Sequence, residues 1–234
     1  LFEDPFTPDN HKYPLVASDS FVNHSYQIAA EAITLLKNSN GVLPISADKK
    51  VFVTGPMANS LTMINGSWGR TWQGTDEQWN DTTKNTILGA IQANFTDVTF
   101  EQGCDIDTLI QEKIAYNKAQ NSDLIIACMG EFPSTEKPGD IHSLNLERAQ
   151  VEYVKGLAKL GKPIVLVLVE NRARVIHEIE PLCESIVLAY QPSENGSDAL
   201  ADVLSGEINP SGKLPITYPK HTNSLLLYDH KYTD

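Results

Sequence analysis

Basic residues, cysteines and long apolar runs are scarce in this sequence. The 18 Lys and Arg are outnumbered by 30 Asp and Glu, and the formal net charge of -12 argues against nucleic acids and anionic membrane surfaces as partners. The three cysteines, Cys104, Cys128 and Cys183, lie far apart without CxxC spacing, so neither a zinc site nor a disulfide framework is indicated. No apolar run approaches the roughly 20 residues that cross a bilayer, so no membrane-spanning segment is expected.

Two common functional motifs are missing as well. After the first expected strand, TGPMAN stands where a Gly-rich phosphate loop would be, which argues against a dinucleotide cofactor. No GxSxG elbow is present, which argues against Ser-His-Asp hydrolysis. His142 and His177 are isolated in the sequence, and such histidines are more often surface or packing residues than catalysts. We therefore expect no cofactor and no metal.

The first residues, LFEDPFTPDN, have no initiating Met, no basic region and no apolar signal run. They are typical of an interior linker, so residues 1–17 are interpreted as a linker that follows another domain.

From residue 18 onward, helical periodicities alternate with short apolar runs. Expected helices cover residues 18–37, 82–94, 107–120, 147–160 and 194–204. Expected strands cover 51–56, 98–103, 123–130, 162–170 and 185–190, with LPITY at 214–218 last. This alternation predicts a three-layer α/β/α sandwich over residues 18–220, with a mostly parallel sheet of about six strands. Residues 221–234 are then a C-terminal tail.

Two unusual loops leave the carboxyl ends of expected strands. One covers residues 57–80, which is long for a connection without its own periodicity, and the other covers 130–146. Ligands of parallel sheets gather at the carboxyl ends of the strands. We therefore expect both loops to face one cleft.

The second loop begins with GEFPSTEKPGD and places Glu131, Glu136 and Asp140 among small and turn-forming residues. These carboxylates could serve as a general acid or base, as a cation site, or as a solvated acidic loop. A calcium site is the weakest of the three, because the spacing lacks the alternating ligands and central Gly of an EF-hand. A solvated loop is the more common case, because exposed Glu and Asp are ordinary. The position at the end of a strand raises the acid/base interpretation, because a carboxylate beside apolar walls can retain a proton near neutral pH.

The first loop contains NGSWGRTWQGTDEQW, with all three tryptophans of the chain, Trp68, Trp72 and Trp79. Their neighbours are polar or small, which predicts an exposed aromatic platform. Flat aromatic faces suit sugar rings, nucleobases or other planar partners. We nevertheless expect at least one of the three to anchor the loop in the core.

Five segments stand in a specific order and spacing: AAEAITLLKNSNGVLPI, GSWGRTWQG, DLIIACMGEFPSTEKPGD, KPIVLVLVENRAR and INPSGKLPITYPK. Together they resemble the second, α/β-sandwich domain of glycoside hydrolase family 3, from about residue 27 to 220. The resemblance implies retaining hydrolysis of β-glycosides, commonly β-glucosides or oligosaccharides. It also implies an N-terminal (β/α)8 barrel as the partner domain, a cleft between the two domains, and a secreted or periplasmic location.

The resemblance also implies roles for individual residues. The nucleophilic aspartate belongs to the barrel, Glu136 is the acid/base residue, and Glu131 is structural. Trp72 flanks a sugar subsite, with Trp68 as the second choice. On this interpretation the isolated chain is inactive.

The chain departs from the family pattern at two of these segments. It has Glu136-Lys137-Pro138-Gly139-Asp140 where the family often has Glu-Gly-x-Asp-Arg, and Asn171-Arg172-Ala173 where Gly-Arg-Pro is common. A competing hypothesis is therefore a non-catalytic carbohydrate-binding or interaction module with a degenerate acid loop.

Overall fold

One sheet of six strands organises residues 18–223, the part of the chain that this computed structural model describes. The strand order is β1-β6-β5-β4-β2-β3, with β1 antiparallel to β6 and the other neighbouring pairs parallel. The predicted linker 1–17 and most of the predicted tail 221–234 lie outside the described residues. The strands are β1 (Thr34–Asn38), β2 (Lys50–Thr54), β3 (Asp97–Phe100), β4 (Leu124–Gly130), β5 (Ile164–Val169) and β6 (Ser185–Leu188).

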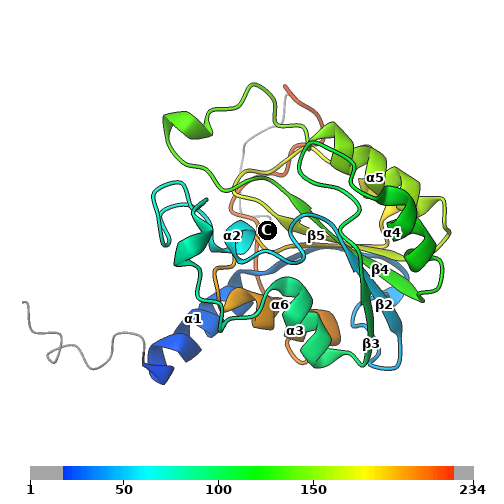
Figure 1. The fold of residues 1–234 in the computed structure, drawn as a ribbon, viewed down its shortest axis with the longest axis horizontal. Coiled ribbons are helices and arrows are strands. Elements are labelled where there is room, and N and C mark those ends of the chain that lie inside the picture. The colour runs from blue at the N-terminus through cyan, green and yellow to red at the C-terminus, as the bar shows by residue number, and fades with distance from the viewer. Residues whose placement is uncertain (1–17, 224–234) are drawn as a thin grey trace, which may run out of the picture.

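Helices cover both faces of this sheet (Figure 1). They are α1 (Asp19–Ala32), α2 (Leu61–Asn65), α3 (Ile87–Asn94), α4 (Glu112–Ala119), α5 (Arg148–Ala158) and α6 (Gly196–Ser205). Helices α1, α3 and α6 pack on one face, and α4 and α5 pack on the other. Each face has its own core, because alternate residues of a strand point to opposite sides: Val165 and Val167 belong to one core, Leu166 and Leu168 to the other. The predicted three-layer α/β/α sandwich is confirmed.

The neighbouring strands β2 and β4 send the chain toward opposite faces of the sheet. The chain after β2 leads to α3 on one face, whereas the chain after β4 leads to α5 on the other. Such a reversal is a topological switch point, where open α/β sheets bind their ligands. Gly55, directly after β2, has a φ of +100°, and a Cβ there would lie 2.2 Å from the Cys128 carbonyl oxygen of β4. The two loops therefore start close together.

The helix predicted over residues 18–37 is too long. Helix α1 ends at Ala32, and Thr34–Asn38 forms β1, which pairs with β6 from Thr34↔Leu188 to Asn38↔Ser185. The β-branched Ile33 and Thr34 weaken helix continuation, and the edge of β6 offers backbone partners that the helix cannot. The apolar spacing alone did not distinguish these outcomes.

LPITY at 214–218 is not a strand in the structure. Pro215 lacks a backbone N–H for a sheet hydrogen bond. The side chains of Leu214 and Tyr218 instead pack against the core between the sheet and helices α4 and α5. The sheet nevertheless has the expected six strands, because β1 is a strand that was not predicted.

The loop after β2 is more ordered than its sequence predicts. It contains the short helix α2, whose N-cap Ser60 accepts a hydrogen bond from the Met63 N–H, and a 3-10 turn at Glu77–Trp79. The other predicted helices and strands are present with shifted ends.

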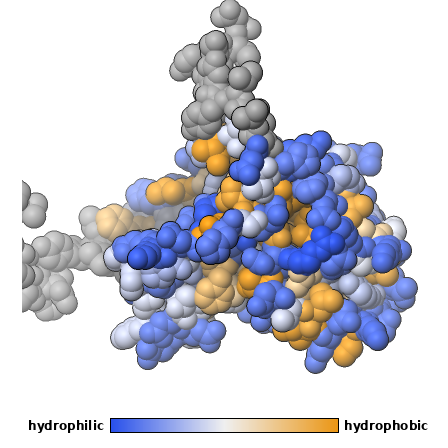
Figure 2. All heavy atoms as spheres, turned by 90° about the horizontal axis from the view of Figure 1, so that it is seen from above, coloured by the Kyte–Doolittle hydropathy of each residue, from blue (hydrophilic) through white to orange (hydrophobic). Residues whose placement is uncertain are grey.

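The three cysteines are buried and free. Among the described helices, none combines the length and apolar character that crossing a membrane requires. Figure 2 shows a face on which hydrophilic residues predominate and hydrophobic ones emerge in several places.

Candidate functional site

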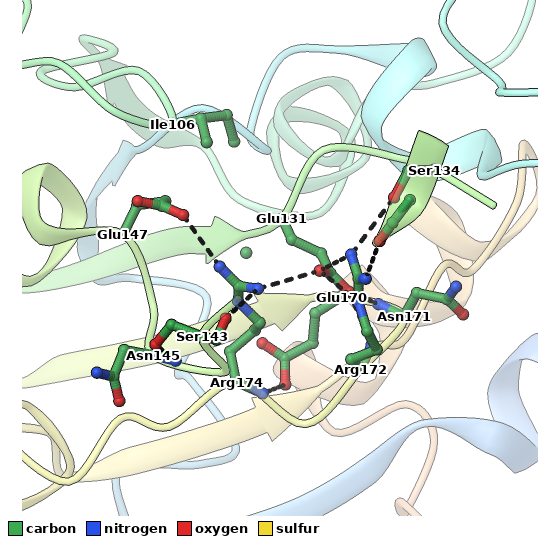
Figure 3. Close-up of polar contacts among 12 residues, drawn as sticks. Ile106, Glu131, Ser134, Ser143, Asn145, Glu147, Glu170, Asn171, Arg172 and Arg174 are labelled. Carbon is green, nitrogen blue, oxygen red and sulfur yellow. Dashed lines mark hydrogen bonds and ion pairs between the residues drawn. The ribbon is translucent and has the colours of Figure 1, made fainter. Parts of the chain in front are cut away.

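The loop after β4 begins with a buried ion pair. Glu131 is only 4% exposed, and its Oε2 lies 2.7 Å from Arg172 Nη2 and 3.6 Å from Arg174 Nη1 (Figure 3). The backbone N–H groups of Asn171 and Arg172 donate to its Oε1 at 2.9 and 2.8 Å. Glu131 thus joins the carboxyl ends of β4 and β5, in keeping with the structural role expected for it.

Arg172 also holds the loop farther along. Its Nη1 donates to the Gly139 carbonyl oxygen, and its Nη2 lies 3.3 Å from Ser134 Oγ. Glu131, Ser134 and Gly139 are therefore bound by a single guanidinium group. The segment between Ser134 and Gly139 is fixed at both of its ends.

Glu136 occupies the middle of this fixed segment, and its side chain is exposed. Its backbone has φ 54° and ψ -153°, a region that is populated almost only by glycine and costs of order 1–3 kcal/mol for other residues. The Gly139 N–H donates to the Glu136 carbonyl oxygen at 2.9 Å. A residue keeps such a conformation only where its surroundings enforce it, and such residues cluster at functional sites.

The tryptophans of the other loop are all exposed. Trp68 is 66% exposed, Trp72 48% and Trp79 57%, so the interpretation that one of them anchors the loop in the core is wrong. The Trp68 N–H donates to the Trp72 carbonyl oxygen at 3.0 Å, and a Cβ on Gly74 would lie 2.2 Å from the Gly66 carbonyl oxygen. Backbone contacts therefore shape the part of the loop that bears Trp68 and Trp72.

Gln73 joins the two loops. Its Nε2 donates to the Thr135 carbonyl oxygen at 3.1 Å, and its Oε1 accepts from the Thr135 N–H at 3.0 Å. Trp72 and Glu136 are therefore each one residue away from this contact. The two loops also project from the same end of the sheet in Figure 1. They therefore meet at this contact, and that they face one cleft stays a prediction.

A second buried carboxyl group lies behind Glu131. Glu170 directly follows β5 and is 1% exposed, and the Tyr218 hydroxyl lies 2.5 Å from its Oε1. The Arg174 N–H donates to the same oxygen at 3.2 Å (Figure 3). Burial raises the pKa of the Glu170 carboxyl to about 8.

Glu170, Arg174 and Gln73 were not singled out from the sequence. The acidic residue that closes the apolar run KPIVLVLVE was a usable signal for Glu170, because charged groups rarely enter such strands. Gln73 lay inside the recognised WQG segment, but its partner is 62 residues away.

The remaining candidates do not assemble into a site. Asp140, His142 and His177 are exposed, and the His177 ring lies against that of His221, with centroids 4.6 Å apart. Within residues 18–223, no three His, Cys, Asp or Glu side chains are grouped so that they could hold a metal ion.

Residues 33–234 match the glycosyl hydrolase family 3 C-terminal domain. Among curated relatives, the lysosomal beta glucosidase of Dictyostelium discoideum is 36% identical over 220 residues, which cover 88% of this chain and 27% of that protein. The periplasmic beta-glucosidase of Salmonella typhimurium is 28% identical, with 97% of this chain and 33% of that protein covered. The chain thus spans a third or less of the length of these two relatives.

Solved structures agree with the sequence comparison. A beta-glucosidase from Listeria innocua in complex with isofagomine has a TM-score of 0.82 at 24% identity, and the match covers 94% of this chain and 30% of that one. A beta-glucosidase involved in saponin metabolism from intestinal bacteria has a TM-score of 0.81 at 26% identity, over 94% and 36% of the two chains. The chain belongs to glycosyl hydrolase family 3, of which it carries the C-terminal domain.

Proposed function

We propose that this chain is the second domain of a retaining β-glycosidase that acts on β-glucosides, and that Glu136 is its acid/base residue. The contact between Gln73 and Thr135 carries the proposal, because it brings an aromatic loop and a carboxylate loop together at the switch point of the sheet. Membership of family 3 and the enforced backbone conformation of Glu136 support it.

The chemistry needs two carboxyl groups on opposite sides of the glycosidic bond. In the first step, a carboxylate of the barrel domain attacks the anomeric carbon while the Glu136 carboxyl gives its proton to the departing oxygen. In the second step, Glu136 removes a proton from water as the water attacks the glycosyl-enzyme, which regenerates both groups. Glu136 is exposed on this domain, so the opposite wall of the site would come from the barrel.

Trp72 and Trp68 would contact the sugar. Both side chains are about half or more exposed. They belong to the loop that contacts the acid loop, residues 130–146, through Gln73. Aromatic faces pack well against the C–H faces of sugar rings, and the polar rims of the loops can bind hydroxyl groups. The neutral ligand also suits a chain with an excess of acidic residues.

A leaving-group series on the full-length enzyme tests the role of Glu136. The Glu136→Ala variant should lose roughly 10² to 10⁴-fold in kcat/KM on alkyl glucosides, whose leaving groups need a proton. On dinitrophenyl glucosides kcat/KM should hardly change, since dinitrophenolate departs without protonation. An equal loss on both substrates would contradict the assignment.

The exposed tryptophans also favour a second candidate, a non-catalytic carbohydrate-binding module. The two candidates differ in what the barrel domain adds. Calorimetric titration of the isolated chain with cello-oligosaccharides, alongside an activity assay with and without the barrel, separates them. A binding module would bind glycan by itself and would gain no turnover when the barrel is supplied.

A further inference from the structure

Gln73 contacts a single residue of the acid loop, Thr135, with both ends of its side-chain amide. The distances are 3.1 Å from Nε2 to the Thr135 carbonyl oxygen and 3.0 Å from Oε1 to the Thr135 nitrogen. This pair of hydrogen bonds needs a donor and an acceptor on one planar group, and the amides of Asn and Gln supply both without taking up or losing a proton. The contact therefore fixes the orientation of the Thr135 backbone as well as its position.

The Thr135 carbonyl group belongs to the peptide unit that joins Thr135 to Glu136. Its orientation determines the φ of Glu136, which is 54°. On the other side of Glu136, the Gly139 N–H holds the Glu136 carbonyl oxygen at 2.9 Å, and Arg172 in turn binds the Gly139 carbonyl oxygen. Both peptide units that flank Glu136 are thus restrained, and Gln73 is the restraint that comes from the tryptophan loop.

The position of Gln73 depends on the loop that bears Trp72. Trp72 is its chain neighbour and accepts a hydrogen bond from the Trp68 N–H at 3.0 Å, and Gly74 follows in contact with the Gly66 carbonyl. Arg70 of the same loop forms an ion pair with Glu194 at 2.6 Å. A shift of the Trp72 backbone would therefore carry Gln73 along and release Thr135.

We infer that Gln73 is a positioning residue that holds Glu136 in its proton-donating orientation and links it to the loop of Trp72. The inference rests on the proposed function, since it gives Gln73 a role only through Glu136. Gln73 itself need not touch the substrate. A misplacement of about 1 Å can reduce a rate by about 10²-fold, so two hydrogen bonds remote from the reacting atoms are enough to matter.

A purely structural role for Gln73 makes a different prediction. If Gln73 only supported the tryptophan loop, its loss would weaken substrate binding and raise KM equally for all leaving groups. If it positions the acid, its loss should affect those substrates that need a proton. The dependence of kcat/KM on the leaving group therefore separates the two roles, because kcat/KM reports the steps up to glycosidic bond cleavage.

The experiment compares Gln73→Ala with Gln78→Ala in the full-length enzyme. Gln78 is a matched control, because it is an exposed glutamine of the same loop whose side chain bonds to Asp76 at 2.9 Å. Gln73→Ala should lower kcat/KM on alkyl glucosides by about 10-fold to 10²-fold. It should leave kcat/KM on dinitrophenyl glucosides nearly unchanged. Gln78→Ala should leave kcat/KM unchanged on both substrates. Gln73→Met, which keeps the length of the side chain without its hydrogen bonds, replaces the alanine variant if the latter does not fold.

Combining these substitutions with Glu136→Ala gives the decisive comparison. Residues that act through one another have non-additive effects, so Gln73→Ala should have no further effect on alkyl glucosides once Glu136 is absent. Additive losses, or a uniform rise in KM, would overturn the inference and leave the role of Glu136 intact. A Glu136→Ala variant without leaving-group dependence would instead contradict the proposed function itself.

Discussion

The Nη2 atom of Arg172 lies 2.7 Å from Oε2 of Glu131, and this ion pair joins the carboxyl ends of β4 and β5 beneath the acid loop. Glu131 is almost completely buried, whereas the Arg172 side chain is partly exposed. The pair thus connects the interior of the sheet to the segment that carries Glu136.

Glu131→Ala should destabilise the domain severely. The substitution removes the carboxylate that accepts from two backbone N–H groups and from Arg172, and it weakens the pairing of the buried Arg174. Breaking a buried ion pair costs about 3–5 kcal/mol. Urea denaturation measures the loss, with the exposed Glu136→Ala as the comparison, which should stay within about 0.5 kcal/mol of wild type. Equal effects of the two substitutions would be inconsistent with a structural role that belongs to Glu131.

The raised pKa of Glu170 predicts that stability falls as the pH rises. In the unfolded chain this carboxyl loses its proton near its ordinary pKa of 4.5, whereas in the folded chain it keeps the proton up to a pKa of about 8. Between these values the unfolded state binds fewer protons, so a rise in pH favours unfolding.

Glu170→Gln tests this prediction, because glutamine imitates the protonated carboxyl and does not titrate. The free energy of unfolding of wild type, relative to that of Glu170→Gln, should decrease from pH 5 to pH 8. The decrease should be on the order of a few kcal/mol. Tyr218, Arg174 and Glu131 face the same group and are retained in both proteins. If both proteins depend on pH in the same way, Glu170 does not titrate in this interval.

Trp72→Ala should weaken sugar binding in the full-length enzyme with little change in thermal stability. The side chain is 48% exposed, so its removal creates no cavity in the core. KM for aryl β-glucosides and the melting temperature are the two measurements. A large loss of stability with an unchanged KM would identify Trp72 as a packing residue.

The isolated chain should fold cooperatively and yet hydrolyse aryl β-glucosides no faster than buffer. Its described residues contain a complete sheet with a core on each face, whereas the nucleophile is expected on the barrel domain. Denaturation followed by two probes, and an assay of rigorously purified chain, check both parts. Turnover that survives purification would mean that both catalytic carboxylates lie within these 234 residues.

The layered fold could be predicted because each buried strand is a continuous local signal. The runs 123–130 and 162–170 are apolar on both faces, and this pattern predicts strands that are covered on both sides. β1 could not be predicted in this way, because Thr34–Asn38 continues a helical spacing and becomes a strand only by pairing with β6, about 150 residues later. LPITY shows the converse, a local strand pattern that pairs with none of the described strands.

In the candidate site, too, local features could be predicted and contacts between distant segments could not. The tryptophans and Glu136 could be singled out from local composition and from the family resemblance. The contacts that organise them could not, because Gln73 and Thr135 are 62 residues apart and Glu131 and Arg172 are 41 apart. Such contacts depend on which strand ends are neighbours in the sheet. The order of the strands cannot be predicted from any short segment of the sequence.

Azide rescue tests the assignment of Glu136 most directly. In the full-length Glu136→Ala enzyme, a dinitrophenyl β-glucoside should form the glycosyl-enzyme, and hydrolysis of that intermediate should be slow because no base activates water. Azide needs no base and can enter the vacated space, so it should accelerate turnover and yield a β-glycosyl azide. Asp140→Ala is the matched control, since Asp140 is an exposed carboxylate of the same loop and should show no rescue. Formation of the azide product by Asp140→Ala, or its absence with Glu136→Ala, would contradict the assignment of Glu136 as the acid/base residue.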